Sequence, residues 1–376
     1  MTGPPDIAIL LDHFGSGGVE RVACHVANGL AARGMRVEMV VLEDRGPARS
    51  LLDEAVRVHV LDGVTKAARG YRMWGAVPAI ASYLRSRSPA LFHSPGNHTM
   101  RPAAAAAALA RFKQGFVVKV TNPLIGNRAS GWQQLWRRLS FAQALSRADL
   151  VLVLSQIDVE QVAEVAAALR QRIRVVHNPY ISDAMVGSAA GRRPADPPVI
   201  LTVGRLSRQK NQALLLRAAA RLADRPWRLQ LCGTGPDEAS LRGLAAELGI
   251  ADRVDFAGFV ADLIPYYLAA TVTASPSRYE GLPATVLEAI ACGCPVVATA
   301  SSPALTALLR QVGARRAVPL DDEVAFSKAL GEALNGRLPA VPPAAALPYG
   351  VEASLGEHAA IFAGLMSGAN KARAEF

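Results

Sequence analysis

Two glutamates stand on either side of a Gly-Leu-Pro turn in the second half of the sequence. Glu280 directly precedes this turn, and Glu288 follows after seven further residues, inside the apolar segment 284–291. Backbone N–H groups at the start of a helix after such a turn can bind a phosphate. A carboxylate on an otherwise apolar helix needs polar partners, and ribose hydroxyls are suitable ones. The pair therefore favours a site for a phosphorylated nucleoside over two unrelated surface glutamates.

Two cations, Arg205 and Lys210, flank a turn after the apolar run 199–203, which we expect to be a strand. A guanidinium and an ammonium in this position can clamp a diphosphate and neutralise the charge that develops on a leaving group. Solvated loop cations are the alternative for an isolated pair. The position at the end of a strand favours the functional interpretation.

A glycine-rich turn follows the first apolar run, 7–11, and includes Gly17 and Gly18. Glycines allow a backbone to approach an anion closely, and the helix expected from about residue 19 offers free N–H groups. A tight turn without any ligand explains the same residues equally well. The turn is not a Gly-x-Gly-x-x-Gly fingerprint with a downstream acid, which argues against a dinucleotide-dependent dehydrogenase.

The cysteines and histidines do not have metal-site spacing. Cys292 and Cys294 are separated by one residue, and no pair of histidines has the His-x-x-x-His spacing. We therefore expect buried reduced thiols and no metal site.

Alternating strand and helix patterns indicate an α/β fold. Val-rich runs separated by helical segments are typical of a parallel sheet covered on both faces. The expected strands are 7–11, 36–42, 56–61, 90–93, 116–120, 150–154 and 174–176, followed by 199–203, 227–232, 254–257, 271–275 and 295–299. The composition of 181–198, with several prolines and no periodic pattern, is that of a linker. We predict two doubly wound, Rossmann-like domains, 1–180 and 199–350, that face a central cleft, and a C-terminal helix, 351–376, that packs back toward the first domain.

The charge is concentrated in the first half. The 376 residues are 51% hydrophobic and 19% charged, which excludes a disordered chain. Between residues 63 and 148 there are 13 basic residues and no acidic one, together with Trp74, Trp132 and Trp136. A field of one sign attracts a polyanion, and Trp residues favour a membrane interface. We expect a cytoplasmic protein without a transmembrane helix, peripheral on the inner face of the plasma membrane. Core tryptophans on an Arg-rich chain are the alternative, and no motif supports nucleic-acid binding.

Several motifs taken together resemble a known enzyme family. They are the Glu280-x7-Glu288 pattern with its Gly-Leu-Pro turn, Cys-Gly-Cys-Pro-Val-Val-Ala-Thr at 292–299, Gly-Arg-Leu-Ser at 204–207 with Lys-Asn at 210–211, and Gly-Thr-Gly-Pro at 233–236. The segment 254–260, the Gly-Gly-Val-Glu at 17–20 and the Val-Val-His-Asn-Pro at 175–179 also fit. The chain resembles, over nearly its whole length, the retaining GT-B glycosyltransferases of family 4, the glycosyl transferases group 1.

This resemblance implies a donor nucleotide-sugar, UDP- or GDP-linked, that is held mainly by the second domain without a metal. Arg205 and Lys210 would bind the diphosphate, Glu280 the transferred sugar and Glu288 the ribose; Arg205, Lys210 and Glu280 would be catalytic. The donor-binding set would comprise Gly17, Gly18, Arg205, Lys210, Val260, Glu280, Gly281, Leu282 and Glu288. The implied function is transfer of a hexose with retention to a glycan or polyprenyl-diphosphate (lipid-linked) acceptor, in cell-envelope or exopolysaccharide assembly.

Two departures from the family pattern concern the acceptor and the sugar. The segment Thr121-Asn122-Pro123 stands where many relatives carry a histidine, and neither His93 nor His98 can be assigned to that role. Ser301-Ser302 stands where relatives often have Gly-Gly. The alternatives are a catalytically silent protein of the same fold that binds a glycan or lipid, and a sugar-nucleotide epimerase.

Overall fold

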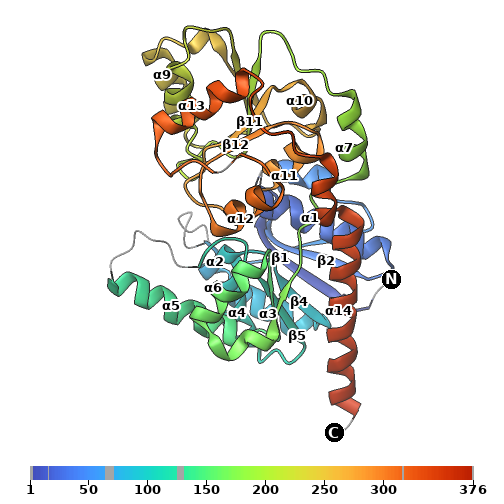
Figure 1. Ribbon diagram of the computed structural model, residues 1–376. Helices are drawn as coiled ribbons and strands as arrows, with labels where there is room; N and C mark the ends of the chain where they lie inside the picture. The colour runs from blue at the N-terminus through green and yellow to red at the C-terminus, as the bar shows by residue number, and fades with distance from the viewer. Residues whose placement is uncertain (1–2, 16, 64–71, 125–130, 316, 375–376) are drawn as a thin grey trace. The chain divides into compact units, whose positions relative to one another are not determined.

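The computed structural model describes residues 3–15, 17–63, 72–124, 131–315 and 317–374. The chain divides into two units (Figure 1). Unit 1 contains residues 1–179 and 352–376, and unit 2 contains residues 180–351. Each unit is built on a sheet in which all the strand pairs are parallel. The predicted α/β class with two Rossmann-like sheets is confirmed.

Unit 1 has a seven-stranded sheet in the order β3-β2-β1-β4-β5-β6-β7. The chain runs outward from β1 in one direction and then returns past it to β4, so the strand order reverses beside β1. The strands are β1 (Ile7–His13), β2 (Val37–Glu43), β3 (Arg57–Val60), β4 (Leu91–Ser94), β5 (Gly115–Lys119), β6 (Leu150–Val153) and β7 (Ile173–Val175).

The helices of unit 1 cover both faces of this sheet. They are α1 (Gly18–Ala32), α2 (Arg72–Gly75), α3 (Val77–Arg87), α4 (Asn97–Ala110), α5 (Gly131–Ser146), α6 (Gln156–Val165) and α14 (Val351–Ala374), of which all but Val351 belong to this unit. One face of β4 and β5 buries Phe92, Phe116 and Val118 in a core with α3, α4 and α5. Alternate residues of a strand point to opposite faces, so His93 and Lys119 lie on the other side.

Helix α14 packs on that second face. The Lys119 Nζ lies 3.2 Å from His358 Nε2, and the rings of His93 and Phe362 are 5.4 Å apart. Gly29 of α1 permits close approach, because a Cβ there would lie 2.4 Å from a methyl carbon of Leu355. The C-terminal helix thus belongs to the core of unit 1.

Unit 2 has a five-stranded sheet in the order β10-β9-β8-β11-β12. The strands are β8 (Val199–Val203), β9 (Arg228–Cys232), β10 (Val254–Gly258), β11 (Val272–Ser275) and β12 (Val296–Ala298). The helices are α7 (Asp183–Ser188), α8 (Gln212–Ala220), α9 (Glu238–Glu247), α10 (Ile264–Ala269), α11 (Ala284–Ala291), α12 (Pro303–Gln311) and α13 (Glu323–Leu334). Short 3-10 turns cover Ala189–Gly191, Ala251–Arg253 and Pro343–Tyr349 in this unit, and Pro47–Leu51 and Ala167–Arg172 in unit 1.

The segment 181–198 is folded, although its composition is that of a linker. Ser182 caps α7 by accepting a hydrogen bond from the Met185 N–H, and Arg192 donates to the carbonyl of Ala270. The segment therefore packs within unit 2 rather than joining two domains as a free connection. Among the described residues, no helix has both the length and the apolar character needed to span a membrane.

Candidate functional site

Two glycines bring together the turns that follow β8 and β9. Gly204 and Gly233 have φ of 143° and 146°, and a Cβ on Gly233 would lie 2.0 Å from the Gly204 carbonyl oxygen. The Gly204 N–H donates to Cys232 O at 2.9 Å, and the Leu206 N–H donates to Thr234 O at 3.0 Å. Only glycine adopts this backbone and allows this approach without strain. The turn that carries Arg205 and Lys210 is thereby fixed at the carboxyl edge of the sheet.

The structure brings Lys210 and Glu280 into direct contact. Lys210 Nζ lies 2.6 Å from Glu280 Oε1, and the Ser277 hydroxyl donates to the same oxygen at 2.8 Å. Glu280 is buried, and its N–H donates to Ser301 O. A charge-assisted pair at this distance fixes both groups, so one anion and one cation are presented together at the strand ends.

The other cation, Arg205, is on the same turn, and its side chain is exposed. Gln212 holds the turn by donating to the Arg205 carbonyl oxygen at 3.1 Å. Val260 follows β10 at the same edge of the sheet, and Gly281 and Leu282 are buried in the turn before α11. The residues predicted for the donor in this unit therefore follow strands β8, β10 and β11, whose ends meet at one edge.

Glu288 has a partner that sequence reasoning did not find. One of its carboxylate oxygens accepts a hydrogen bond from the Tyr267 hydroxyl at 2.7 Å, and both side chains are buried. Burial, with Glu288 beside it, holds the pKa of Tyr267 well above its ordinary value. The carboxylate that we expected to meet ribose hydroxyls is thus oriented by a phenol on α10. Tyr267 lies 21 residues away, in an unremarkable Tyr-Tyr pair, and gave no signal in the sequence.

Ser302, at one departure from the family pattern, closes the other side of the loop. Its hydroxyl donates to Gly281 O at 2.7 Å and accepts from the Leu305 N–H at 3.1 Å, which caps α12. The neighbouring Ser301 hydroxyl is buried without a hydrogen-bond partner in the structure. A buried hydroxyl without a partner is costly to leave in a folded protein.

In unit 1 the predicted glycines lie at the start of α1. Gly17 is the residue before the helix and Gly18 is its first residue; a Cβ on Gly18 would meet nothing within 4 Å. Gly18 is therefore not required for a close backbone contact within unit 1, and the space beside the start of α1 is open. Residue 16 of the same turn lies outside the described residues.

A charged group that the sequence analysis missed lies at the end of β1. His13 Nδ1 is 3.4 Å from Asp12 Oδ2, and Arg72 lies 3.5 Å from Asp12 Oδ1. A hydrogen bond from His13, followed by the charges of Arg72 and His98, lowers the pKa of the Asp12 carboxyl. Asp12 Oδ1 and His13 Nδ1 are buried, and these contacts are longer than ordinary hydrogen bonds. These two residues were hidden because their segment directly continues the apolar strand.

The loop after β5, where relatives often have a histidine, is held by Asn97. The Asn97 side chain accepts from the Thr121 N–H at 2.9 Å and donates to Asn122 O at 2.8 Å. His93 instead faces the core under α14, where burial lowers its pKa to about 3. Of the two histidines considered, His98 contributes to the electrostatic environment of Asp12 and His93 is part of the core.

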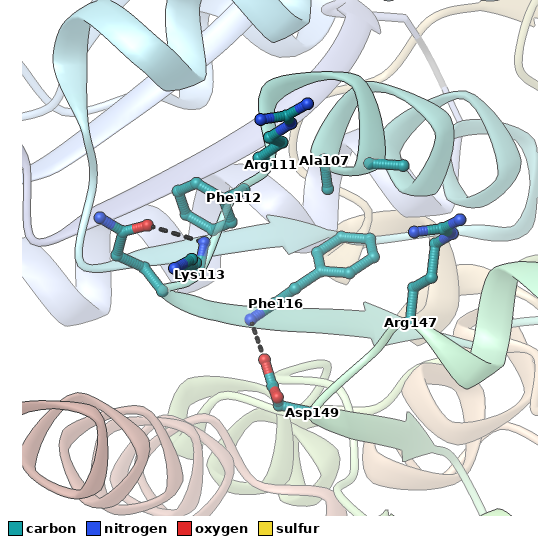
Figure 2. Close-up of a pocket in the computed structure, with 9 residues that line it drawn as sticks. Ala107, Arg111, Phe112, Lys113, Phe116, Arg147 and Asp149 are labelled. Atoms are coloured by element: carbon teal, nitrogen blue, oxygen red, sulfur yellow. Dashed lines mark hydrogen bonds between the residues drawn. The ribbon is translucent and has the colours of Figure 1, made fainter. Parts of the chain in front are cut away.

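A separate pocket lies at the opposite edge of the unit 1 sheet, where β5 and β6 begin (Figure 2). Arg111, Lys113 and Arg147 line it, and Asp149 accepts a hydrogen bond from the Phe116 N–H at 2.8 Å. The cations are exposed, and the pocket is remote from the carboxyl ends of the same strands. It is not part of the candidate site.

The cysteines are buried and reduced. Burial raises the pKa of Cys24 and of Cys232 to about 12, so both thiols are protonated near neutral pH. Within the described ranges, no group of three or more His, Cys, Asp or Glu side chains could hold a metal ion. Whether the reaction requires a metal stays a prediction.

Comparison with known proteins identifies the family. The model of the Glycosyl transferase 4-like domain matches residues 17–179, and that of Glycosyl transferases group 1 matches residues 188–341. The chain belongs to the group 1 glycosyl transferases. The family resemblance inferred from the motifs is confirmed, and so is a glycosyltransferase as the class of enzyme, whereas retention stays a prediction.

Curated relatives of this glycosyltransferase have names that refer to different substrates or processes. The lipopolysaccharide core biosynthesis glycosyltransferase LpsE of Rhizobium meliloti is 27% identical over 77% of this chain and 78% of its own length. The D-inositol 3-phosphate glycosyltransferase of Acidothermus cellulolyticus is 35% identical over 53% of this chain. The chain spans about half or less of the length of the inositol-phosphate enzymes.

Solved structures share the fold of this glycosyltransferase. A sucrose-phosphate synthase from Thermosynechococcus elongatus has a TM-score of 0.73 at 22% identity, covering 96% of this chain and 99% of its own. HepE of Anabaena, solved in complex with UDP and glucose, has a TM-score of 0.70 at 19% identity, covering 99% and 98%. At these identities the likeness establishes the GT-B fold alone.

Proposed function

We propose that this glycosyltransferase moves a hexose, with retention, from a UDP- or GDP-linked sugar to a glycan or lipid-linked acceptor. The observation that carries the proposal is the contact between Lys210 and Glu280 at the carboxyl edge of the unit 2 sheet, beside the exposed Arg205. Ligands of open α/β sheets bind at this edge. One fixed carboxylate and two cations suit a sugar attached to a diphosphate.

The cations would act on the charge that develops in the reaction. Breaking the sugar–phosphate bond leaves negative charge on the departing diphosphate, and a cation there stabilises the transition state more than the ground state. Lys210 and Arg205 would bind the diphosphate, with the Leu282 N–H on a phosphate oxygen. These groups replace the electrostatic role that a metal has in other transferases. We therefore expect full activity in the presence of a chelator.

The carboxylates would bind the two sugars of the donor. Glu280, fixed by Ser277 and Lys210, would accept hydrogen bonds from hydroxyls of the transferred hexose. Glu288, oriented by Tyr267, would accept from the ribose, and the backbone at Val260 would contact the base. Because Glu280 is assigned to the sugar hydroxyls, we propose that the acceptor attacks the sugar from the same face that the phosphate leaves. A phosphate oxygen would then take the proton of the acceptor hydroxyl.

The donor and acceptor classes draw support from relatives. HepE was solved with UDP and glucose, which favours a UDP-hexose donor. LpsE acts in lipopolysaccharide core biosynthesis, and WaaB, a structural neighbour, is a lipopolysaccharide outer core galactosyltransferase. We propose a glycan acceptor of the cell envelope, held by unit 1 near Asp12 and His13, because a carboxylate and an imidazole at the end of β1 suit hydroxyl groups.

An exposed apolar stripe on α5 supports peripheral binding to a membrane. Trp132 and Trp136 are 76% and 68% exposed, and Leu135 and Leu139 are also exposed. The four positions share one face of a helix. The alternative that these tryptophans are core residues is wrong. Arg137 beside this stripe is exposed, and the sequence has no acidic residue between residues 63 and 148. The face therefore suits anionic lipid.

A panel of nucleotides and nucleotide-sugars tests the proposal. We expect UDP, GDP or their hexose conjugates to raise the melting temperature, since a ligand at 100 times its Kd stabilises a protein by ~2.7 kcal/mol. Transfer of labelled sugar to a membrane extract, with the anomeric configuration read by NMR, tests turnover and retention. Binding without transfer would favour a silent binding protein, and C2 inversion of the free donor would favour an epimerase.

A further inference from the structure

Two loops of unit 2 carry the proposed catalytic residues, and a set of polar contacts joins them away from those residues. The first loop, 204–211, carries Arg205 and Lys210, and the second, 276–282, carries Glu280. The Arg278 N–H donates to Gln209 O at 2.8 Å, and the Gln209 amide donates to Tyr279 O at 3.0 Å. Arg278 also donates through its guanidinium to Arg208 O at 3.3 Å. The second loop therefore lies along the backbone of the first.

A third segment meets both loops at one carboxylate. Asp321 Oδ1, in the turn before α13, accepts from Arg278 Nε at 3.1 Å and from Asn211 Nδ2 at 3.3 Å. Asn211 is the residue directly after Lys210. The carboxylate of Asp321 therefore ties the end of the Lys210 loop to the residue two positions before Glu280.

Two members of this set have a strained backbone. Asn211 and Asp321 have φ of 54° and 56°, in the left-handed region that favours glycine. Only four non-glycine residues in the described part of the chain have a positive φ, and these two are hydrogen-bonded to each other. Strained residues persist where the surroundings fix them, and they gather at functional sites.

Folding stability alone does not account for this arrangement. The Arg278 and Asp321 side chains are 29% and 38% exposed, and ion pairs at such exposure contribute little to stability. A glycine at position 321 would relieve the strained backbone. The chain instead has a carboxylate at a position whose backbone conformation glycine adopts without strain.

From this arrangement we infer that Asp321 and Arg278 are positioning residues, which hold the Lys210 loop against Glu280 for the transfer step. This inference rests on the proposed function of the same site. Lys210 folds back over Gly204, with its Cε 3.1 Å from where a Cβ of Gly204 would lie, and reaches Glu280 from there. Movement of residue 211 would move Lys210 Nζ relative to Glu280. Misplacing a group that stabilises the transition state lowers kcat more than it weakens donor binding.

The substitution Asp321→Gly separates positioning from folding, because it removes the carboxylate and relieves the backbone strain together. We expect an unchanged or higher Tm, a donor KM within about threefold of wild type, and a kcat lower by about tenfold. Arg278→Ala should act in the same direction, and Arg278→Lys, which keeps the charge, should recover part of the loss. Glu238→Gln, which breaks an exposed ion pair on α9 with Arg242, is the matched control and should change nothing.

A double-mutant cycle tests whether the carboxylate acts through Lys210. In a Lys210→Met background, Asp321→Gly should cause no further loss, because residues that act as a unit are not additive. An unchanged kcat in Asp321→Gly, or the same tenfold loss in both backgrounds, would overturn the inference. A wild-type protein that binds no nucleotide-sugar would instead overturn the proposed function.

A crystal structure of Asp321→Gly gives an answer that does not depend on turnover. The inference expects the contact of 2.6 Å between Lys210 Nζ and Glu280 Oε1 to open or to become disordered. A Lys210 side chain that keeps this contact unchanged in the variant would contradict it.

Discussion

The carboxyl edges of the two sheets are built differently. In unit 2, hydrogen bonds between loops fix the backbone around Lys210 and Glu280, and the two side chains contact each other. In unit 1, the corresponding edge holds Asp12, which lies 3.4 Å from His13 and 3.5 Å from Arg72. The unit 2 edge is fixed by contacts of 2.6 and 2.8 Å around Glu280, whereas the unit 1 edge has longer contacts that a ligand can replace.

This difference fits the proposal that the unit 2 edge binds the donor and the unit 1 edge binds the acceptor. A diphosphate sugar presents the same charge and hydroxyls in every reaction of its kind, so a site fixed in advance binds it at low cost in ordering. The names of the relatives refer to lipopolysaccharide core biosynthesis and to D-inositol 3-phosphate, so we expect acceptors to differ between enzymes of this kind. Function that varies is usually carried by loops on a rigid scaffold. The comparison predicts that changes in unit 2 abolish all turnover, whereas changes in unit 1 affect transfer alone.

The largest effect is expected from Glu280→Gln in unit 2. This variant keeps the size of the side chain, loses the charge that pairs with Lys210, and should lower kcat/KM by about 10²–10³-fold, as removal of a preorganised electrostatic contact does elsewhere. Both sugar transfer and slow hydrolysis of the donor by water should fall together, which assays with and without acceptor measure. Parallel melting curves check the fold. Full turnover in a folded variant would remove Glu280 from the site.

A smaller and more selective effect is expected from Asp12→Asn in unit 1. The amide is nearly isosteric but cannot accept hydrogen bonds at both positions, so transfer to the acceptor should fall by roughly 10–100-fold, the range of one general-base or hydrogen-bond contact. Donor binding by calorimetry and hydrolysis without acceptor should match wild type. Equal losses in transfer and hydrolysis would contradict the division between the two edges.

The sequence predicted the positions of the strands better than the contacts between side chains. The strands lie within about two residues of their predicted positions, because runs such as Val37–Leu42 are buried on both faces and leave a strong apolar signal. Lys210 and Glu280 were predicted by type and position, although nothing in their spacing indicated that they touch. The partner of Glu288 is 21 residues away and Asp321 is 110 residues from Asn211. Pairings of this kind depend on the packing of separate loops, which leaves no periodic pattern to detect.

Local signals were also misleading in two places. The segment 181–198 has the composition of a linker, yet Ser182 and Arg192 supply side-chain hydrogen bonds that fold it into unit 2. Asp12 and His13 continue an apolar strand and were not considered as site residues. In both cases polar side chains with tertiary partners determine the structure, and composition does not report partners.

The exposed apolar stripe of α5 provides a test of membrane binding by unit 1. Replacing Trp132 and Trp136 together by Ser should lower binding to anionic vesicles at low salt by about tenfold, because two exposed rings lose their place in the head-group region. Turnover with a water-soluble acceptor should not change, because α5 is not part of either site. Val324→Ser, at an exposed apolar position of unit 2, is the matched control and should bind vesicles like wild type. Equal binding by all three proteins, measured by flotation, would exclude α5 as the membrane face.

The smallest effect concerns stability and is expected in unit 1 alone. Burial lowers the pKa of the Lys119 ammonium to about 7, with Glu357 opposing the shift, and the amine contacts His358 on α14. The unfolded chain keeps this proton up to its ordinary pKa of 10.5, so above pH 7 the unfolded state binds more protons and stability rises with pH. Between pH 7 and pH 8 the gain should be about 1 kcal/mol. The pKa of His358 is lowered below 6.5, so its own contribution lies at lower pH. Lys119→Met should remove this slope in urea titrations, whereas an unchanged slope would show that Lys119 stays charged under α14.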